Sequence, residues 1–177
     1  MTLKSSRLLH QGRIIRLEEH TVAFPDGSAG ILDVVRHPGA AAVVPFLDDP
    51  SAPDPRILLI RHFRHAAGGW LWEIPAGRLD AGEAEAPERC AHRELREETG
   101  YTAAAMTRLL TIVTTPGFSD EVIHLFRATG LAAGKHAREA DEFMELHECP
   151  RSRVWGMIRA GEITDAKTLV GLMFALS

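Results

Sequence analysis

The sequence is poor in cysteine and has no long hydrophobic run. Cys90 and Cys149 are the two cysteines in 177 residues, and neither has a CxxC partner. Two separated thiols exclude a disulfide framework and a cysteine-based zinc site, and they fit a reducing compartment. The longest apolar runs, such as residues 40–47 and 57–60, fall well short of the roughly 18 residues that a membrane-spanning helix needs. The N-terminal segment also has no secretion signal. We therefore expect a cytoplasmic protein with no membrane partner.

A large excess of charge of one sign is also missing. The sequence has 20 Lys and Arg residues against 24 Asp and Glu residues, which gives a net charge of −4. Proteins that bind nucleic acid or anionic membranes through general electrostatics carry a basic excess, so this balance argues against nucleic acid as a partner. Because the chain has no overall positive charge, any polyphosphate ligand must be recognised by a local group of side chains. A chain of this length can also bury a core without disulfides or a structural metal.

The hydrophobic pattern predicts mostly strands, with helices in the middle and at the end of the chain. A turn at Pro25-Asp26-Gly27 predicts a β-hairpin from residues 13–20 and 30–36. The last helix is expected to be capped by Thr164 or Asp165. Further strands are expected at residues 40–46, 56–63, 70–74, 106–114, 122–129 and 142–148, and helices at residues 87–99, 152–160 and 166–176. The sequence therefore predicts an α+β domain at residues 39–177, preceded by an N-terminal β-hairpin extension at residues 1–38.

Three glutamates gather on the first predicted helix. Glu94 and Glu98 are four residues apart and Glu97 lies three residues after Glu94, so the three carboxylates share one helix face. Like charges at this spacing repel, and a cation is therefore expected beside them. Carboxylate oxygens without His or Cys suit Mg²⁺ or Mn²⁺. The alternative is a solvated helix face on which Arg93 and Arg96 neutralise the acids.

A glycine-punctuated loop leads from a predicted strand into this helix, and this context favours the cation site. Loop and helix together resemble the signature of the Nudix hydrolases, G-x5-E-x7-R-E-U-x-E-E-x-G-U, in which U is apolar. Gly77 matches the opening glycine and residues 93–101 match the second half. Counting back from Arg93 selects Glu85 as the first glutamate, whereas counting on from Gly77 selects Glu83, because the loop is two residues longer than the signature. The resemblance implies a Nudix fold, in which mixed β-sheets are sandwiched between helices.

The resemblance also implies roles for the residues that match it. It implies Mg²⁺ as the cofactor, with Mn²⁺ able to substitute, and water as the nucleophile that attacks a diphosphate. Glu94 and Glu98 are then expected to bind the metal, with Glu97 as a third ligand and the backbone carbonyl of Ala76 as a further one. Glu97 and Arg93 belong to the expected catalytic group, in which Arg93 orients the carboxylates.

Related enzymes draw one more glutamate from a loop before the last strand. Glu142 is the first choice for this role, as metal ligand or general base, and Glu139 is the second. An acidic loop in solvent is the alternative for Glu139.

Further segments resemble the bacterial ADP-ribose pyrophosphatase branch of the family. Pro116 stands where that branch carries a proline, which implies an ADP-sugar substrate. Arg64 resembles an arginine that contacts substrate phosphates, although a structural ion pair is the alternative. Arg36, with His37, is expected to reach the adenosine portion. These segments are residues 59–66, 70–77, 116–121 and 163–168.

The resemblance therefore implies hydrolysis of ADP-ribose to AMP and ribose 5-phosphate. It also implies a homodimer, in which the N-terminal hairpin crosses to the partner. One alternative is a Nudix hydrolase for another nucleotide sugar, such as GDP-mannose or ADP-glucose. A second is a non-catalytic Nudix-fold module that senses a ligand, against which the intact Glu94, Glu97 and Glu98 argue.

Overall fold

The computed structural model describes residues 1–80, 85–134 and 143–177. The chain forms two compact units, one made of residues 1–39 with 113–122 and the other of residues 40–112 with 123–177. Both units contain β-sheet, and the helices belong to the larger unit, so the expected α+β class is confirmed. No helix within the described ranges has the length and apolar character needed to cross a membrane.

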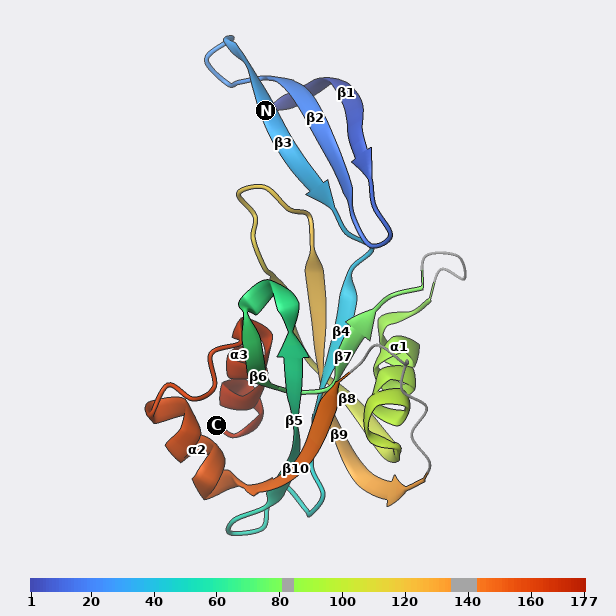
Figure 1. The fold of residues 1–177 in the computed structure, drawn as a ribbon, viewed down its shortest axis with the longest axis vertical. Coiled ribbons are helices and arrows are strands. Elements are labelled where there is room, and N and C mark those ends of the chain that lie inside the picture. Colours follow the sequence, from blue (N-terminus) through green and yellow to red (C-terminus); the bar gives the residue numbers. More distant parts are fainter. Residues whose placement is uncertain (81–84, 135–142) are drawn as a thin grey trace. The chain divides into compact units, whose positions relative to one another are not determined.

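The smaller unit contains an antiparallel sheet of three strands in the order β1-β2-β3 (Figure 1). The strands are β1 (Thr2–Gln11), β2 (Arg16–Ala23) and β3 (Ala29–Arg36). The predicted hairpin is β2 with β3, and its turn contains Gly27 at a φ of 88°. The sequence did not predict strand β1, because all ten of its residues are exposed and it lacks the apolar alternation that marks a half-buried strand.

The larger unit contains two sheets, ordered β7-β4-β9-β8 and β10-β5-β6. The core strand β4 is parallel to β9 and antiparallel to β7. This mixed pairing agrees with the expected mixed sheets. The strands are β4 (Ala40–Pro45), β5 (Arg56–Arg64), β6 (Gly69–Glu73), β7 (Ala76–Arg78), β8 (Tyr101–Val113), β9 (Val122–Ala133) and β10 (Met144–Pro150).

Strand β4 divides the hydrophobic core in two, because its side chains alternate between two buried faces. Ala42 and Val44 pack in one cluster with residues of β5 and of the C-terminal helices α2 (Arg151–Arg159) and α3 (Ala166–Ala175). Ala41 and Val43 pack in the other cluster, against the helix α1 (Pro87–Glu94). Figure 1 shows α1 and the α2–α3 pair on opposite sides of this sheet region. The helices therefore enclose the sheets, as expected.

The first predicted helix differs from expectation at its C-terminal end. Regular α-helix ends at Glu94, and one wider π-helical turn, η2 (Leu95–Thr99), follows before Gly100 ends the run at a φ of 80°. The Thr99 hydroxyl donates to the Leu95 carbonyl within this turn. Such side-chain bonds compete with regular helix geometry, and π turns occur often at functional sites. The carboxylates of the expected site thus lie on a helix that changes its winding.

Candidate active site

Close contact between β7 and α1 brings the backbone of the loop to the Glu94 carboxylate. Strand β7 pairs with β4, which places Gly77 directly against the helix. A Cβ atom at Gly77 would overlap the carboxylate of Glu94. The opening glycine of the motif is therefore required by space, because any side chain there would displace Glu94.

Glu98 is held against the neighbouring residue of β7. The backbone N–H of Ala76 donates to Glu98 Oε2 at 3.0 Å, and Glu98 is only 3% exposed. Glu94 is 9% exposed. Two buried carboxylates on one helix face are costly to keep ionised without compensating charge or hydrogen bonds. Arg64 contributes part of this compensation, since its charge acts on Glu98.

Arg93 gathers the remaining acids of the motif around its guanidinium group. Its Nη1 donates to Glu94 at 2.5 Å and to Glu97 at 3.0 Å, while Nε and Nη2 bind both oxygens of Glu85 at 3.1 and 2.9 Å. These carboxylates raise the pKa of Arg93, and Arg93 in turn lowers the pKa of Glu85. Glu85 thus occupies the position that pairs with Arg93, while Glu83 lies outside the described residues.

The donor chemistry of this cluster fits a hard divalent cation. The side-chain atoms of this cluster that could bind a metal are all carboxylate oxygens, the ligands that Mg²⁺ and Mn²⁺ prefer. Glu94 and Glu98 are the buried pair, whereas Glu97 keeps 32% of its side chain exposed and turns to Arg93. In the described part of the chain, no three His, Cys, Asp or Glu side chains are already drawn together as a metal-binding group. The Arg93 guanidinium instead neutralises Glu94 and Glu97.

A second group of charges lies at the end of β5 and β6, around the buried Glu73. Arg64 forms a two-point ion pair with Glu73, at 2.9 and 2.7 Å, and Lys167 Nζ donates to the same carboxylate at 3.0 Å. Burial alone would raise the pKa of Glu73, but these two cations outweigh it and lower the pKa to about 2. Burial and the charge of Arg64 lower the pKa of the nearby His62 to about 4. Arg64 therefore forms a structural ion pair, which the sequence suggested as the alternative to a contact with substrate phosphates.

Comparisons with known proteins identify the family of the chain. A family model described as NUDIX domain matches residues 36–169. The chain belongs to the Nudix family.

Relatives of this Nudix chain have names that describe different functions. The ADP-ribose pyrophosphatase of Bacillus subtilis is 37% identical over 168 residues, which cover 94% of this chain and 87% of the relative. The methanol dehydrogenase activator of Bacillus methanolicus is 35% identical over 175 residues, with 98% and 90% covered. The GDP-mannose pyrophosphatase of Yersinia enterocolitica is 36% identical over 132 residues, with 70% and 68% covered.

A solved structure supports the fold. The crystal structure of an ADP compounds hydrolase matches 98% of this chain and 90% of its own, with a TM-score of 0.82 at 19% identity. The expected Nudix fold and the assignment to the Nudix pyrophosphohydrolases are thus confirmed.

Several residues around the Nudix motif were missed as members of the site. Glu73 stands inside an apolar strand, which is a signal for a paired buried acid. Asp165 and Thr168 have the spacing of a helix cap, and Asp165 is indeed the cap, as one of the two predicted choices. Lys167, which reaches Glu73, lies between them. The sequence places these residues in recognisable local patterns, but it does not show that α3 packs against β6.

Two predicted substrate residues of the Nudix chain belong to the smaller unit. Arg36 donates to Glu18 at 3.0 Å and to Asp120 at 2.8 Å, so its guanidinium is held between two acids. Pro116 lies in the loop between β8 and β9, where Phe118 and Ser119 both donate to the Thr115 carbonyl. The roles of Arg36 and Pro116 toward a substrate remain predictions. The two acidic-loop candidates, Glu139 and Glu142, lie outside the described residues.

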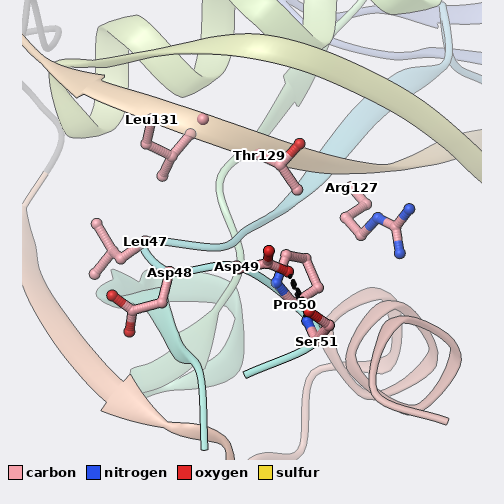
Figure 2. Close-up of a pocket in the computed structure, with 9 residues that line it drawn as sticks. Leu47, Asp48, Asp49, Pro50, Ser51, Arg127, Thr129 and Leu131 are labelled. Carbon is pink, nitrogen blue, oxygen red and sulfur yellow. Dashed lines mark hydrogen bonds between the residues drawn. The ribbon is translucent and has the colours of Figure 1, made fainter. Parts of the chain in front are cut away.

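A separate hollow of about 610 Å³ lies between the loop at residues 47–51 and the end of β9 (Figure 2). It shares no lining residue with the acidic cluster. Arg127 Nε in its wall is buried and has no hydrogen-bond partner in the described residues. The two acids of the wall have other partners, since Asp48 is paired with Arg56 at 2.8 Å and Asp49 accepts from Ser51. The hollow is therefore distinct from the Nudix site.

Proposed function

We propose that this Nudix protein hydrolyses the diphosphate bond of ADP-ribose or a related nucleoside diphosphate sugar in the presence of Mg²⁺, giving AMP and a sugar phosphate. The observation that supports this most is the burial of Glu94 and Glu98 beside the backbone of Gly77 and Ala76. The relative from Bacillus subtilis, named as an ADP-ribose pyrophosphatase and similar over nearly the whole chain, favours this substrate class.

Glu94 and Glu98 are the proposed cation ligands, together with the backbone carbonyl of Ala76, and Glu97 is the proposed third carboxylate. A divalent cation bound there would neutralise diphosphate charge and make an attacking water more acidic. Hydrogen bonding to the Ala76 N–H fixes one oxygen of Glu98, so the other oxygen has a defined direction. Arg93 orients Glu94 and Glu97 by binding both.

The proton of the attacking water needs an acceptor, and Glu97 is our choice among the described residues. Its side chain is the most exposed of the four motif glutamates that Arg93 or Ala76 holds. An exposed carboxylate can exchange protons with solvent after each turnover. Over the whole sequence Glu142 stays the first choice for this base and Glu139 the second, and both lie outside the described residues.

Substrate recognition is proposed to use Arg64, Arg36 and Pro116. Arg64 is bound to Glu73 through Nε and Nη2 and keeps 39% of its side chain exposed, so it can present positive charge to a diphosphate without losing its ion pair. Arg36 is proposed for the adenosine portion, and Pro116 for the preference for ADP-sugars. GDP-mannose or ADP-glucose is the alternative substrate, and the relative named as a GDP-mannose pyrophosphatase keeps that alternative open. A non-catalytic module has less support, since Glu94, Glu97 and Glu98 are all present.

The test is a panel of ADP-ribose, ADP-glucose and GDP-mannose incubated with the protein and Mg²⁺, with release of AMP or GMP measured. We expect ADP-ribose to be hydrolysed fastest. Glu98→Gln should lower turnover by about 100-fold or more, because a principal electrostatic contributor is lost. Glu88→Gln is the matched control, since Glu88 is an exposed acidic residue in the first turn of the same helix, and it should retain activity. Full activity of Glu98→Gln would exclude the proposed metal site.

A further inference from the structure

We propose that Thr168 is a positioning residue for Glu98, acting through the backbone of residues 74–76. The inference rests on the proposed function, because it takes Glu98 to be a cation ligand. It concerns a residue of α3, far from the Nudix motif in the sequence, and it assigns to that helix a part in holding the motif in place.

The Thr168 hydroxyl is fully used in two buried hydrogen bonds. Thr168 is 0% exposed; its Oγ1 accepts from the backbone N–H of Ile74 at 3.0 Å and donates to Asp165 Oδ2 at 2.6 Å. A threonine hydroxyl has one donor and can accept at the same time, so both capacities are matched. The Ile74 N–H lies just beyond β6 and would be buried without a partner if this hydroxyl were removed.

The first turn of α3 makes Thr168 a rigid support. Asp165 caps the helix by accepting from the Thr168 N–H at 3.0 Å, and it also accepts from Lys167 Nζ at 3.0 Å. Lys167 Nζ reaches Glu73, the residue before Ile74, at 3.0 Å. Glu73 is thus bonded to Lys167. The next residue, Ile74, is bonded to Thr168, which follows Lys167 in the first turn of α3.

From Ile74 the constraint passes to Glu98 through two residues. Pro75 has a fixed φ, and its carbonyl accepts from the Val43 N–H at 2.9 Å in the core strand. The next N–H, that of Ala76, donates to Glu98 Oε2. The chain between the Thr168 bond and the Glu98 bond is therefore short and held on both sides, and its first two residues, Ile74 and Pro75, are buried. A shift at Ile74 must reach the Ala76 N–H that orients Glu98.

A purely structural role makes a different prediction from a positioning role. If Thr168 only fills the core, its loss lowers the unfolding temperature and leaves cation affinity unchanged. If Thr168 positions Glu98, cation affinity falls in the folded protein. Removal of groups that orient metal ligands typically costs about 10- to 100-fold in affinity or activity.

The test compares Thr168→Val, which keeps the shape and loses the hydroxyl, with Thr168→Ser, which keeps the hydroxyl. Thr164→Val is the matched control, because Thr164 is exposed and lies just before α3. Mn²⁺ affinity is measured without substrate, from the electron paramagnetic resonance signal of free Mn²⁺. We expect about tenfold weaker Mn²⁺ binding for Thr168→Val, near-normal binding for Thr168→Ser, and no change for Thr164→Val. Amide hydrogen exchange at Ile74 and Ala76 should become faster in Thr168→Val alone.

Asp165→Asn provides a milder change if Thr168→Val does not fold, because an amide oxygen can still cap the helix. It should weaken Mn²⁺ binding in the same direction. Glu98→Gln separates this inference from the proposed function. Weakened Mn²⁺ binding in Glu98→Gln, with unchanged binding in folded Thr168→Val and Asp165→Asn, would overturn the positioning role alone. Unchanged binding in Glu98→Gln would overturn the proposed metal site and the positioning role with it.

Discussion

Single residues decide whether the acidic cluster can form. The close approach between β7 and α1 leaves no room for a side chain at Gly77, and the Glu94 carboxylate fills that space. The requirement is geometric, because it follows from where the Glu94 oxygens lie rather than from an unusual backbone conformation of the glycine. The conformation of the loop and the position of a proposed ligand are therefore coupled at one residue.

The Gly77→Ala substitution tests this coupling. We expect a loss of activity of about 100-fold or more, comparable to removal of a principal electrostatic contributor, because Glu94 must move. Gly69→Ala is the matched control, since a Cβ at Gly69 in β6 meets no atom within 4 Å. The measurement is the initial rate of AMP release at saturating Mg²⁺, together with the unfolding temperature of both variants. Equal activity of Gly77→Ala and Gly69→Ala would show that the carboxylate tolerates the displacement.

The sequence predicted most of the acidic cluster correctly as a local pattern. Glu94, Glu97 and Arg93 lie within one short helical segment, so helical spacing alone indicated that they would be neighbours, and the structure brings them together. The sequence alone did not decide whether Glu83 or Glu85 is the first glutamate of the motif. The loop is two residues longer than the signature, so counting from Gly77 and counting back from Arg93 select different residues. The pairing of Arg64 with Glu73 was open for a different reason: it depends on the register between two strands, which side-chain periodicity does not fix.

At the scale of elements, β5, β6 and α3 together bury a group of charges. His62 of β5 and Glu73 of β6 are both almost inaccessible to water, with Arg64 and Lys167 as the neighbouring cations. The cations lower the pKa of Glu73 and keep it ionised, whereas burial, helped by the charge of Arg64, lowers the pKa of His62 and keeps it neutral. Both effects lower the number of protons that the folded state binds, so acid should destabilise this part of the fold.

The pH dependence of stability tests this arrangement. The folded pKa of His62 is about 4 against an ordinary value of 6.5, so its contribution is complete above pH 6.5 and is lost as the pH falls towards 4. Between pH 7 and pH 5 this loss amounts to about 2 kcal/mol in the free energy of unfolding. Glu73 adds a further loss from about pH 4.5 down towards 2. Urea unfolding at a series of pH values measures both.

Substitution of the histidine isolates its share. His62→Gln should flatten the curve between pH 6.5 and 4, whereas His92→Gln, at an exposed position of α1, should leave the slope unchanged. An unchanged slope in His62→Gln would mean that another group titrates in this range.

The sequence predicted the elements in which apolar residues recur in a clear pattern, and it did not predict those that lack such a pattern. The apolar runs of β4 and β5 and the caps of α3 give strong local signals. Strand β1 has no buried residue and therefore no signal, although it pairs with β2 along its whole length. The π turn after Glu94 contains the bond from the Thr99 hydroxyl to the Leu95 carbonyl, and helical spacing cannot reveal it.

At the scale of the whole molecule, the smaller unit exposes apolar side chains that one chain alone leaves in water. These include Leu3, Leu8 and Ile31, which are 51%, 54% and 65% exposed. Contiguous exposed apolar residues commonly mark an interaction surface. The expectation of a homodimer built through this N-terminal sheet stays a prediction, and the exposed residues give it a physical reason.

Light scattering after size-exclusion chromatography tests the dimer. We expect a mass of twice 19.4 kDa for the natural sequence. Leu8→Glu replaces an exposed apolar side chain of β1 with a charge and should shift the mass towards the monomer, while Lys4→Glu, at an already polar position of the same strand, should not. A monomeric natural sequence at micromolar concentration would contradict the prediction.

The parallel pairing of β4 with β9 has a consequence for how the protein is made. Ala40 lies opposite Ile123 and Pro45 lies opposite Ala128. The core strand β4 therefore pairs with a strand about eighty residues further along the chain. Contacts between such distant segments close late and slow the folding reaction. On the ribosome, β4 must therefore remain without this neighbour until most of the polypeptide has been synthesised, and an apolar strand exposed for that long is where a chaperone would be needed first.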